Sequence, residues 1–197
     1  MKNINSSVDR NIINRKSLLA FSSKPVEKVK LEIIFEAARW APSSFNAQPW
    51  RYIYAGKDDK GYQLLLSLLF DSNKEWAKTA PMLILSITEM IDIKKNRINR
   101  FAFHDLGLST ANLILQATSL GLFAHPMGGF NESLAIEIFQ IPNGFKAGAI
   151  IALGYPGNPS ILSEDLLKRQ TAPRVRKNLE EIAFKGGWKG KRSEPGS

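Results

Sequence analysis

The spacing of apolar residues along the chain predicts alternating helices and strands. Between residues 25 and 40 apolar side chains recur at helical spacing, so that one face of a helix is buried against a core. Short apolar runs predict strands at 51–55, 81–88, 122–126 and 147–153. Further helices are expected at 61–70, 76–80, 131–140 (with Asn131 as N-cap) and 163–170, with a short element at 179–184. The charged stretch 92–100 fits a loop or an exposed helix.

The longest predicted helix covers residues 104–120 and has few polar positions. A helix that is apolar on nearly all sides is normally buried. A chain of 197 residues offers little interior in which to bury every side of it. We therefore expect a second copy of the chain to cover one face of this helix, with Ile114 as a residue that faces the partner.

Length and composition fit one domain of ordinary size, because 197 residues with 44% hydrophobic side chains can form a full core. No apolar run reaches the roughly 18 residues of a membrane-spanning helix. The polar segment 1–16 lacks the apolar stretch of a signal peptide. The absence of cysteine excludes disulfides, thiolate metal ligands and thiol catalysis. We expect a cytoplasmic protein that does not associate with membranes.

Positive charge is concentrated near the C-terminus. Residues 168–192 contain nine of the 27 Lys and Arg residues and only two Glu. Such a segment suits nucleic-acid binding, a solvated surface, or a phosphate site for a cofactor. No helix-turn-helix, zinc-finger or RNA-recognition motif accompanies it, and the two histidines, His104 and His125, lack metal-ligand spacing. We therefore expect neither a nucleic-acid partner nor a metal site.

The loop between the first predicted helix and the first predicted strand carries the most informative chemistry. Pro42 ends the helix, because it has no N–H and its ring clashes with the preceding turn. Two hydroxyls (Ser43, Ser44) and two amides (Asn46, Gln48) follow. An amide offers a donor and an acceptor in one plane, which suits a heterocycle edge such as the flavin pyrimidine. Ser and Asn are also common in ordinary turns, so composition alone leaves both interpretations open.

The order of residues in and around this loop, AARWAPSSFNAQPWRYI, resembles the signature of the FMN-dependent nitroreductase family. Three other segments resemble further motifs of that family in the same order: RKSLLAF at 15–21, GLFAHPMGGF at 121–130 and RVRKNLEE at 174–181. The resemblance implies an α+β fold with a central mixed sheet flanked by helices. It also implies an intertwined homodimer with FMN at the subunit interface. We expect a single domain over 1–197, in which 185–197 form an extension or a frayed tail.

The resemblance implies three groups of FMN contacts. They are Arg15, Lys16, Ser17, Arg174 and Arg176 at the phosphate, Asn46 and Gln48 at the ring edge with Pro42, Ser43 and Ser44 as further cofactor-binding residues of the same loop, and Pro126, Met127, Gly128 and Gly129 at the ring face. Arginine gives bidentate contacts to phosphate, and glycine lets the backbone approach a ring closely. No side chain is assigned as a catalytic acid or base, since the flavin supplies the chemistry.

The implied activity is ping-pong electron transfer. A hydride passes from NADPH or NADH to flavin N5, and a nitroaromatic, quinone or similar small-molecule acceptor then takes the electrons. One residue departs from the family pattern, because Leu19 stands where relatives usually have Arg or Lys near the flavin. This departure favours an alternative, a flavin-binding protein for flavin handling or regulation, without robust nitroreductase turnover. Leu19 either faces the flavin or packs in the core.

Overall fold

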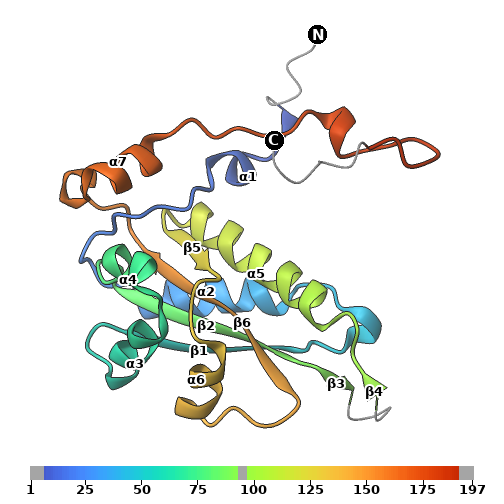
Figure 1. Cartoon of the computed structure of the whole chain (residues 1–197), viewed down its shortest axis with the longest axis horizontal. Helices are drawn as coiled ribbons and strands as arrows, with labels where there is room; N and C mark the ends of the chain where they lie inside the picture. The colour runs from blue at the N-terminus through green and yellow to red at the C-terminus, as the bar shows by residue number, and fades with distance from the viewer. Residues whose placement is uncertain (1–6, 93–96, 191–197) are drawn as a thin grey trace.

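The computed structural model describes residues 7–92 and 97–190, and it shows a four-stranded sheet flanked by helices (Figure 1). The strands, in their order across the sheet, are β1 (Trp50–Gly56), β2 (Met82–Glu89), β6 (Phe145–Gly154) and β5 (Phe123–Met127). Each neighbouring pair is antiparallel. The α+β class is confirmed. The sheet is antiparallel rather than mixed over the described residues, because each connection returns the chain to run opposite to its neighbour.

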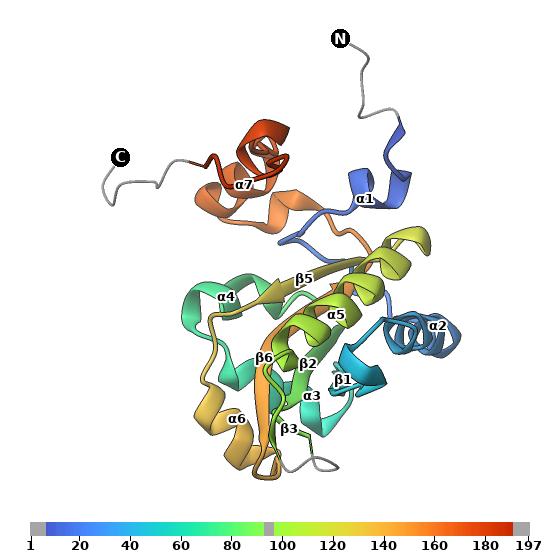
Figure 2. The ribbon, with the colours of Figure 1, turned by 90° about the vertical axis from the view of Figure 1, so that its right-hand side faces the viewer.

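Side chains of the central strand β2 alternate between two cores, as the period of two in a strand requires. Leu83 and Leu85 face one core, whereas Met82 and Ile84 face the other. The first core is covered by α3 (Lys60–Leu68), α4 (Asp71–Ala77) and α6 (Glu132–Ile138). The second is covered by α2 (Lys28–Arg39) and α5 (Ala102–Ser119) (Figure 2).

Helix α5 is buried within its own chain to a greater extent than its sequence suggests. Ile114 is 8% exposed and packs between α2 and the sheet, so the expectation that it faces a partner is wrong. Two polar residues of the helix, Asp105 and Ser109, are also buried. The opposite side includes exposed Phe103 and Gly107. A count of apolar positions does not reveal which neighbours cover a helix, and here the sheet and α2 do so.

Most of the expected elements are present, with ends shifted by a few residues. Asn131 caps α6 by accepting a hydrogen bond from the backbone of Leu134. The charged stretch forms two short paired strands, β3 (Ile91–Asp92) and β4 (Arg97–Ile98), and its residues 93–96 lie outside the described part. The short helix α1 (Arg10–Asn14) was not expected.

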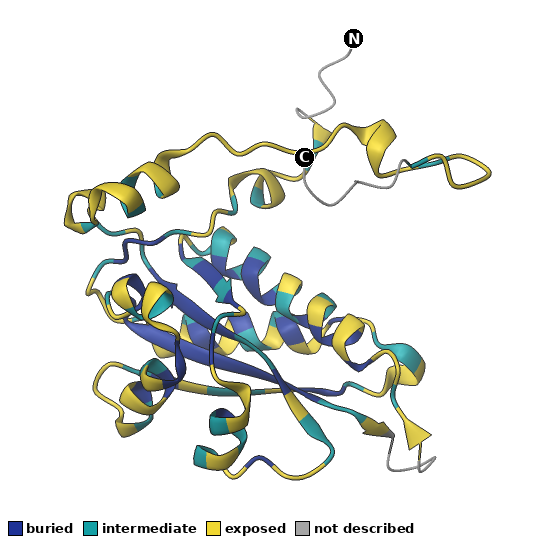
Figure 3. Ribbon diagram, viewed as in Figure 1, coloured by how far each residue is buried: buried dark blue, intermediate teal, exposed yellow. Residues whose placement is uncertain are grey.

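The two ends of the chain lie together beyond the sheet. In both views, α1, helix α7 (Glu164–Thr171) and the stretch 172–190 are grouped at the top (Figures 1 and 2). A short 3-10 turn at Leu179–Glu181 confirms the predicted final element. Figure 3 shows the stretch 172–190 as exposed almost throughout. Its large apolar residues Val175 and Trp188 are more than 80% exposed. Residues 191–197 of the predicted extension lie outside the described part.

Candidate functional site

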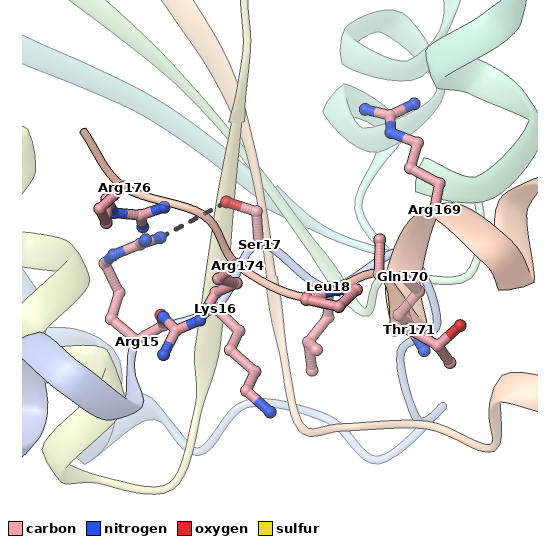
Figure 4. Close-up of a pocket in the computed structure, with 11 residues that line it drawn as sticks. Arg15, Lys16, Ser17, Leu18, Arg169, Gln170, Thr171, Arg174 and Arg176 are labelled. Carbon is pink, nitrogen blue, oxygen red and sulfur yellow. Dashed lines mark hydrogen bonds between the residues drawn. The ribbon is translucent and has the colours of Figure 1, made fainter. Parts of the chain in front are cut away.

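A cavity of about 720 Å³ lies between the two ends of the chain (Figure 4). We call it the basic cradle. Its lining consists of Arg15, Lys16, Ser17 and Leu18 from the N-terminal segment and Arg169, Gln170, Thr171, Ala172, Pro173, Arg174 and Arg176 from α7 and the stretch after it. The structure thus brings together all five residues that the sequence assigned to a phosphate.

Two side chains from distant parts of the sequence fix the N-terminal wall of the cradle. The side-chain oxygen of Gln170 accepts hydrogen bonds from the backbone N–H groups of Leu19 and Ala20, at 2.7 and 2.9 Å. The Nδ1 atom of His125 lies 2.8 Å from the carbonyl oxygen of Leu18, and it carries the hydrogen because a carbonyl only accepts. Neither residue has a predicted role, and Gln170 lies 151 positions after Leu19, so the sequence contains no local pattern that would link them.

The arginines of the cradle crowd one another. Burial, and then the nearby charges of Arg174 and Arg176, lower the pKa of Arg15. Figure 4 shows the guanidinium groups of Arg15 and Arg176 side by side, whereas Arg169 points away. Among the residues that the structure describes, no carboxylate forms an ion pair with Arg15, Arg174 or Arg176. An anion would relieve this repulsion, and arginine geometry favours a phosphate.

Individual arginines of the cradle differ in how free their donors are. Arg174 donates hydrogen bonds to the backbone carbonyl oxygens of Ile13 and Arg15, and so fastens the C-terminal stretch to the N-terminal segment. Arg176 uses one nitrogen on the carbonyl oxygen of its neighbour Val175. A guanidinium has five N–H donors, so each group retains donors for a ligand. Arg174 therefore has a structural role in addition to the predicted phosphate contact.

The amide loop, which we define as residues 43–48, has an unusual backbone. Phe45, Asn46 and Gln48 have φ angles of 52°, 54° and 46°, in the left-handed region. Asn tolerates this region, but Phe and Gln do not favour it, at a cost on the order of 1–3 kcal/mol each. The Ser43 hydroxyl accepts a hydrogen bond from the Gln48 N–H at 3.0 Å and closes the loop. The loop leaves Asn46 exposed at the surface.

The amide loop and the basic cradle lie toward opposite ends of α5. The loop contacts Asp105 near the start of that helix, whereas the N-terminal segment packs beside Gln116 and Ser119 near its end. Eighteen residues of helix span roughly 27 Å. The structure therefore does not bring the phosphate and ring-edge residues together within one chain.

The third predicted group, at the end of β5, is only partly available to a ligand. Met127 is 3% exposed and packs in the first core, so its predicted contact with a flavin ring stays a prediction. A Cβ on Gly129 would lie 2.7 Å from the side-chain nitrogen of Asn73, so packing against α4 explains that glycine. A Cβ on Gly128 meets no atom within 4 Å, and Pro126 is half-buried. Gly128 is exposed, and Pro126 and Gly129 are partly exposed, so these three members of the group are accessible at the surface.

Other site chemistries find no support in the described part of the chain. Ranges 7–92 and 97–190 contain no group of three His, Asp or Glu side chains that could hold a metal ion. No helix in those ranges combines the length and the apolar character needed to cross a bilayer.

Comparisons with known proteins establish the family and support the fold. A model of the Nitroreductase family matches residues 12–74 and 68–155. A crystal structure described as an oxidoreductase containing FMN superimposes with a TM-score of 0.89 and 38% identity, over 93% of this chain and 94% of that one. The crystal structure of a nitroreductase family protein from Clostridium difficile 630 gives a TM-score of 0.71 at 25% identity, over 90% of this chain and 97% of that one.

Sequence relatives extend the comparison. The "Putative NADH dehydrogenase/NAD(P)H nitroreductase" of Rhodopseudomonas palustris is 27% identical over 184 residues, which is 80% of this chain and 93% of that protein. An uncharacterized 15.4 kDa protein of Mycolicibacterium smegmatis is 35% identical over 130 residues, covering 66% of this chain and 86% of that protein. The family match spans more than half of the chain and includes the amide loop and the four N-terminal residues that line the cradle. The chain therefore belongs to the Nitroreductase family.

Proposed function

We propose that this protein is an FMN-dependent NAD(P)H oxidoreductase that reduces a nitroaromatic, a quinone or a similar small acceptor. The basic cradle is the observation that carries the proposal. Three arginines converge on a cavity of about 720 Å³ with no carboxylate paired to them in the described ranges. The similarity to an oxidoreductase containing FMN supports the same ligand.

The residues of this chain divide the work of holding FMN. Arg15 and Arg176, together with Lys16, Ser17 and Arg174, would bind the phosphate through charged hydrogen bonds. Asn46 and Gln48 would pair with the pyrimidine edge. When bound, FMN accepts a hydride from NADPH or NADH and passes the electrons to the acceptor. The protein orients the ring and surrounds it with positive charge, and no side chain serves as a catalytic acid or base.

We infer that the functional unit is a homodimer. The two halves of the predicted site lie at opposite ends of α5, so the amide loop of one copy would complete the cradle of another. The exposed stretch 172–190 carries Val175, Leu179 and Trp188, which are 81%, 58% and 82% exposed. Apolar side chains gathered on an extended segment are typical of an interaction surface. Sedimentation of the holoprotein as a folded monomer would contradict this inference.

The function is tested by spectroscopy of the purified protein. We expect a yellow protein that binds FMN, loses its colour on anaerobic addition of NADPH or NADH, and recovers it with a nitroaromatic or a quinone. A protein that does not take up FMN contradicts the proposal. A protein that binds FMN but is not reduced by either nucleotide supports the alternative of a flavin-handling or regulatory protein. Leu19 no longer favours that alternative, because its side chain lies in the core.

A further inference from the structure

Helix α5 carries a polar face in an otherwise apolar environment. Asp105, Ser109 and Asn112 are spaced by four and three residues, which places them on one side of the helix. Asp105 is 2% exposed and Ser109 is fully buried. All three side chains form hydrogen bonds to the backbone of the segment that ends α2 and begins the amide loop.

Two of the three residues hold the end of α2. The Ser109 hydroxyl donates to the carbonyl oxygen of Ala38 at 2.9 Å, and the Asn112 amide donates to that of Ala37 at 3.2 Å. The last carbonyls of a helix have no partners within the helix and require others. Ser109 and Asn112 therefore serve the packing of α2 on α5, and among the described residues neither forms a hydrogen bond with the amide loop.

Asp105 acts further along the same segment. One oxygen of its carboxyl group accepts a hydrogen bond from the Ser44 backbone N–H at 3.0 Å, and the other lies 3.3 Å from Nδ1 of His104. Ser44 immediately precedes the left-handed residues Phe45 and Asn46. A buried side chain thus fixes the first residue of the strained turn to the body of the protein.

The backbone of the turn requires such a restraint. Non-glycine residues in the left-handed region are disfavoured unless their surroundings hold them there. The hydrogen bond from Gln48 N–H to the Ser43 hydroxyl closes the loop on itself, but it does not attach the loop to the body. The bond from Ser44 to Asp105 does so, across 61 residues of sequence.

We propose that Asp105 is a positioning residue, which holds the amide loop in the conformation in which Asn46 and Gln48 bind the flavin edge. This inference rests on the proposed function. Asp105 does not touch the cofactor and acts through Ser44. When the binding-competent conformation is only a fraction of the population, the apparent affinity falls by that fraction. Loss of the restraint therefore weakens FMN binding without removing any ligand contact.

The test compares three variants in the full-length protein. Asp105→Ala removes the acceptor, and Asp105→Asn retains an acceptor oxygen. Ser109→Ala, one turn along the helix, removes hydrogen bonds to the Ala38 carbonyl and the Tyr52 hydroxyl, neither of which belongs to the loop. The measurements are FMN dissociation constants by fluorescence titration of apoprotein, melting temperatures, and hydrogen exchange of the Ser44 amide. We expect about tenfold weaker FMN binding and faster Ser44 exchange in Asp105→Ala. Asp105→Asn should recover most of the affinity.

The control separates positioning from stability. Ser109→Ala should lower the melting temperature yet keep FMN affinity within about twofold of the wild type. Equal FMN affinities for Asp105→Ala and Ser109→Ala, or unchanged Ser44 exchange in Asp105→Ala, would overturn the inference. Wild-type protein that does not bind FMN would instead refute the proposed function. In that case Ser44 exchange, which needs no cofactor, still decides whether Asp105 holds the loop.

Discussion

Replacement of Leu19 by arginine distinguishes two roles for this position. A cation beside a flavin would stabilise the reduced cofactor and raise its reduction potential. The Leu19 side chain is instead 1% exposed, in the core with Phe21 and Trp76. Its backbone N–H is held by Gln170, so the chain cannot easily turn the side chain outward. We therefore expect Leu19→Arg to destabilise the fold.

The magnitude follows from burial. Removing a buried leucine side chain loses about 2 kcal/mol, and leaving a buried charge without a partner costs about 3–5 kcal/mol more. The neighbouring cradle is already cationic, and no carboxylate among its lining residues could pair with the new guanidinium group. A loss on the order of 5 kcal/mol is a large part of the roughly 5–15 kcal/mol that stabilises a typical domain. For a chain of this size it corresponds to a decrease in melting temperature of about 10–20 °C.

Thermal and urea denaturation measure this loss, and spectroelectrochemistry measures the potential. Leu19→Met is the matched control, because a swap of similar volume should cost less than about 1.5 kcal/mol. If Leu19→Arg melts like the wild type, binds FMN fully and shows a raised potential, then position 19 faces the cofactor and our reasoning from burial is refuted.

Three further predictions concern the cradle and the core. Arg174→Ala and Arg176→Ala should each weaken FMN binding by about 1.5–3 kcal/mol in titrations of apoprotein, whereas the control Lys189→Ala changes an exposed residue and should leave the affinity unchanged. Unchanged FMN affinity in both arginine variants would refute the phosphate assignment. Burial lowers the pKa of His125 below its unfolded value of about 6.5, so the free energy of unfolding of the wild type should fall as the pH drops through 6.5. Urea titrations across this pH range should show a smaller decrease in that free energy for His125→Gln. Ile114→Glu should lower the melting temperature by burying an unpaired carboxylate; lost dimer with an unchanged melting temperature would show that Ile114 faces a partner.

The sequence by itself predicted most of the helices and strands and the residues that line the basic cradle. Apolar spacing located β2 and α5, since side-chain periodicity is a local property of strands and helices. The resemblance also predicted that Arg15, Arg174 and Arg176 share one site, and all three line the basic cradle. These features depend on short segments whose chemistry is visible residue by residue.

The tertiary structure alone decided which side chains face a ligand and which face the core. Met127 is a predicted ring contact and Leu19 lies two residues after the predicted phosphate contact Ser17, and only packing shows that both are buried. Gln170 and Asp105 organise the site through partners 151 and 61 residues away, at separations where no periodic pattern exists. Their hydrogen bonds depend on how the helices lie on the sheet, and that arrangement is set by the whole core rather than by any local segment.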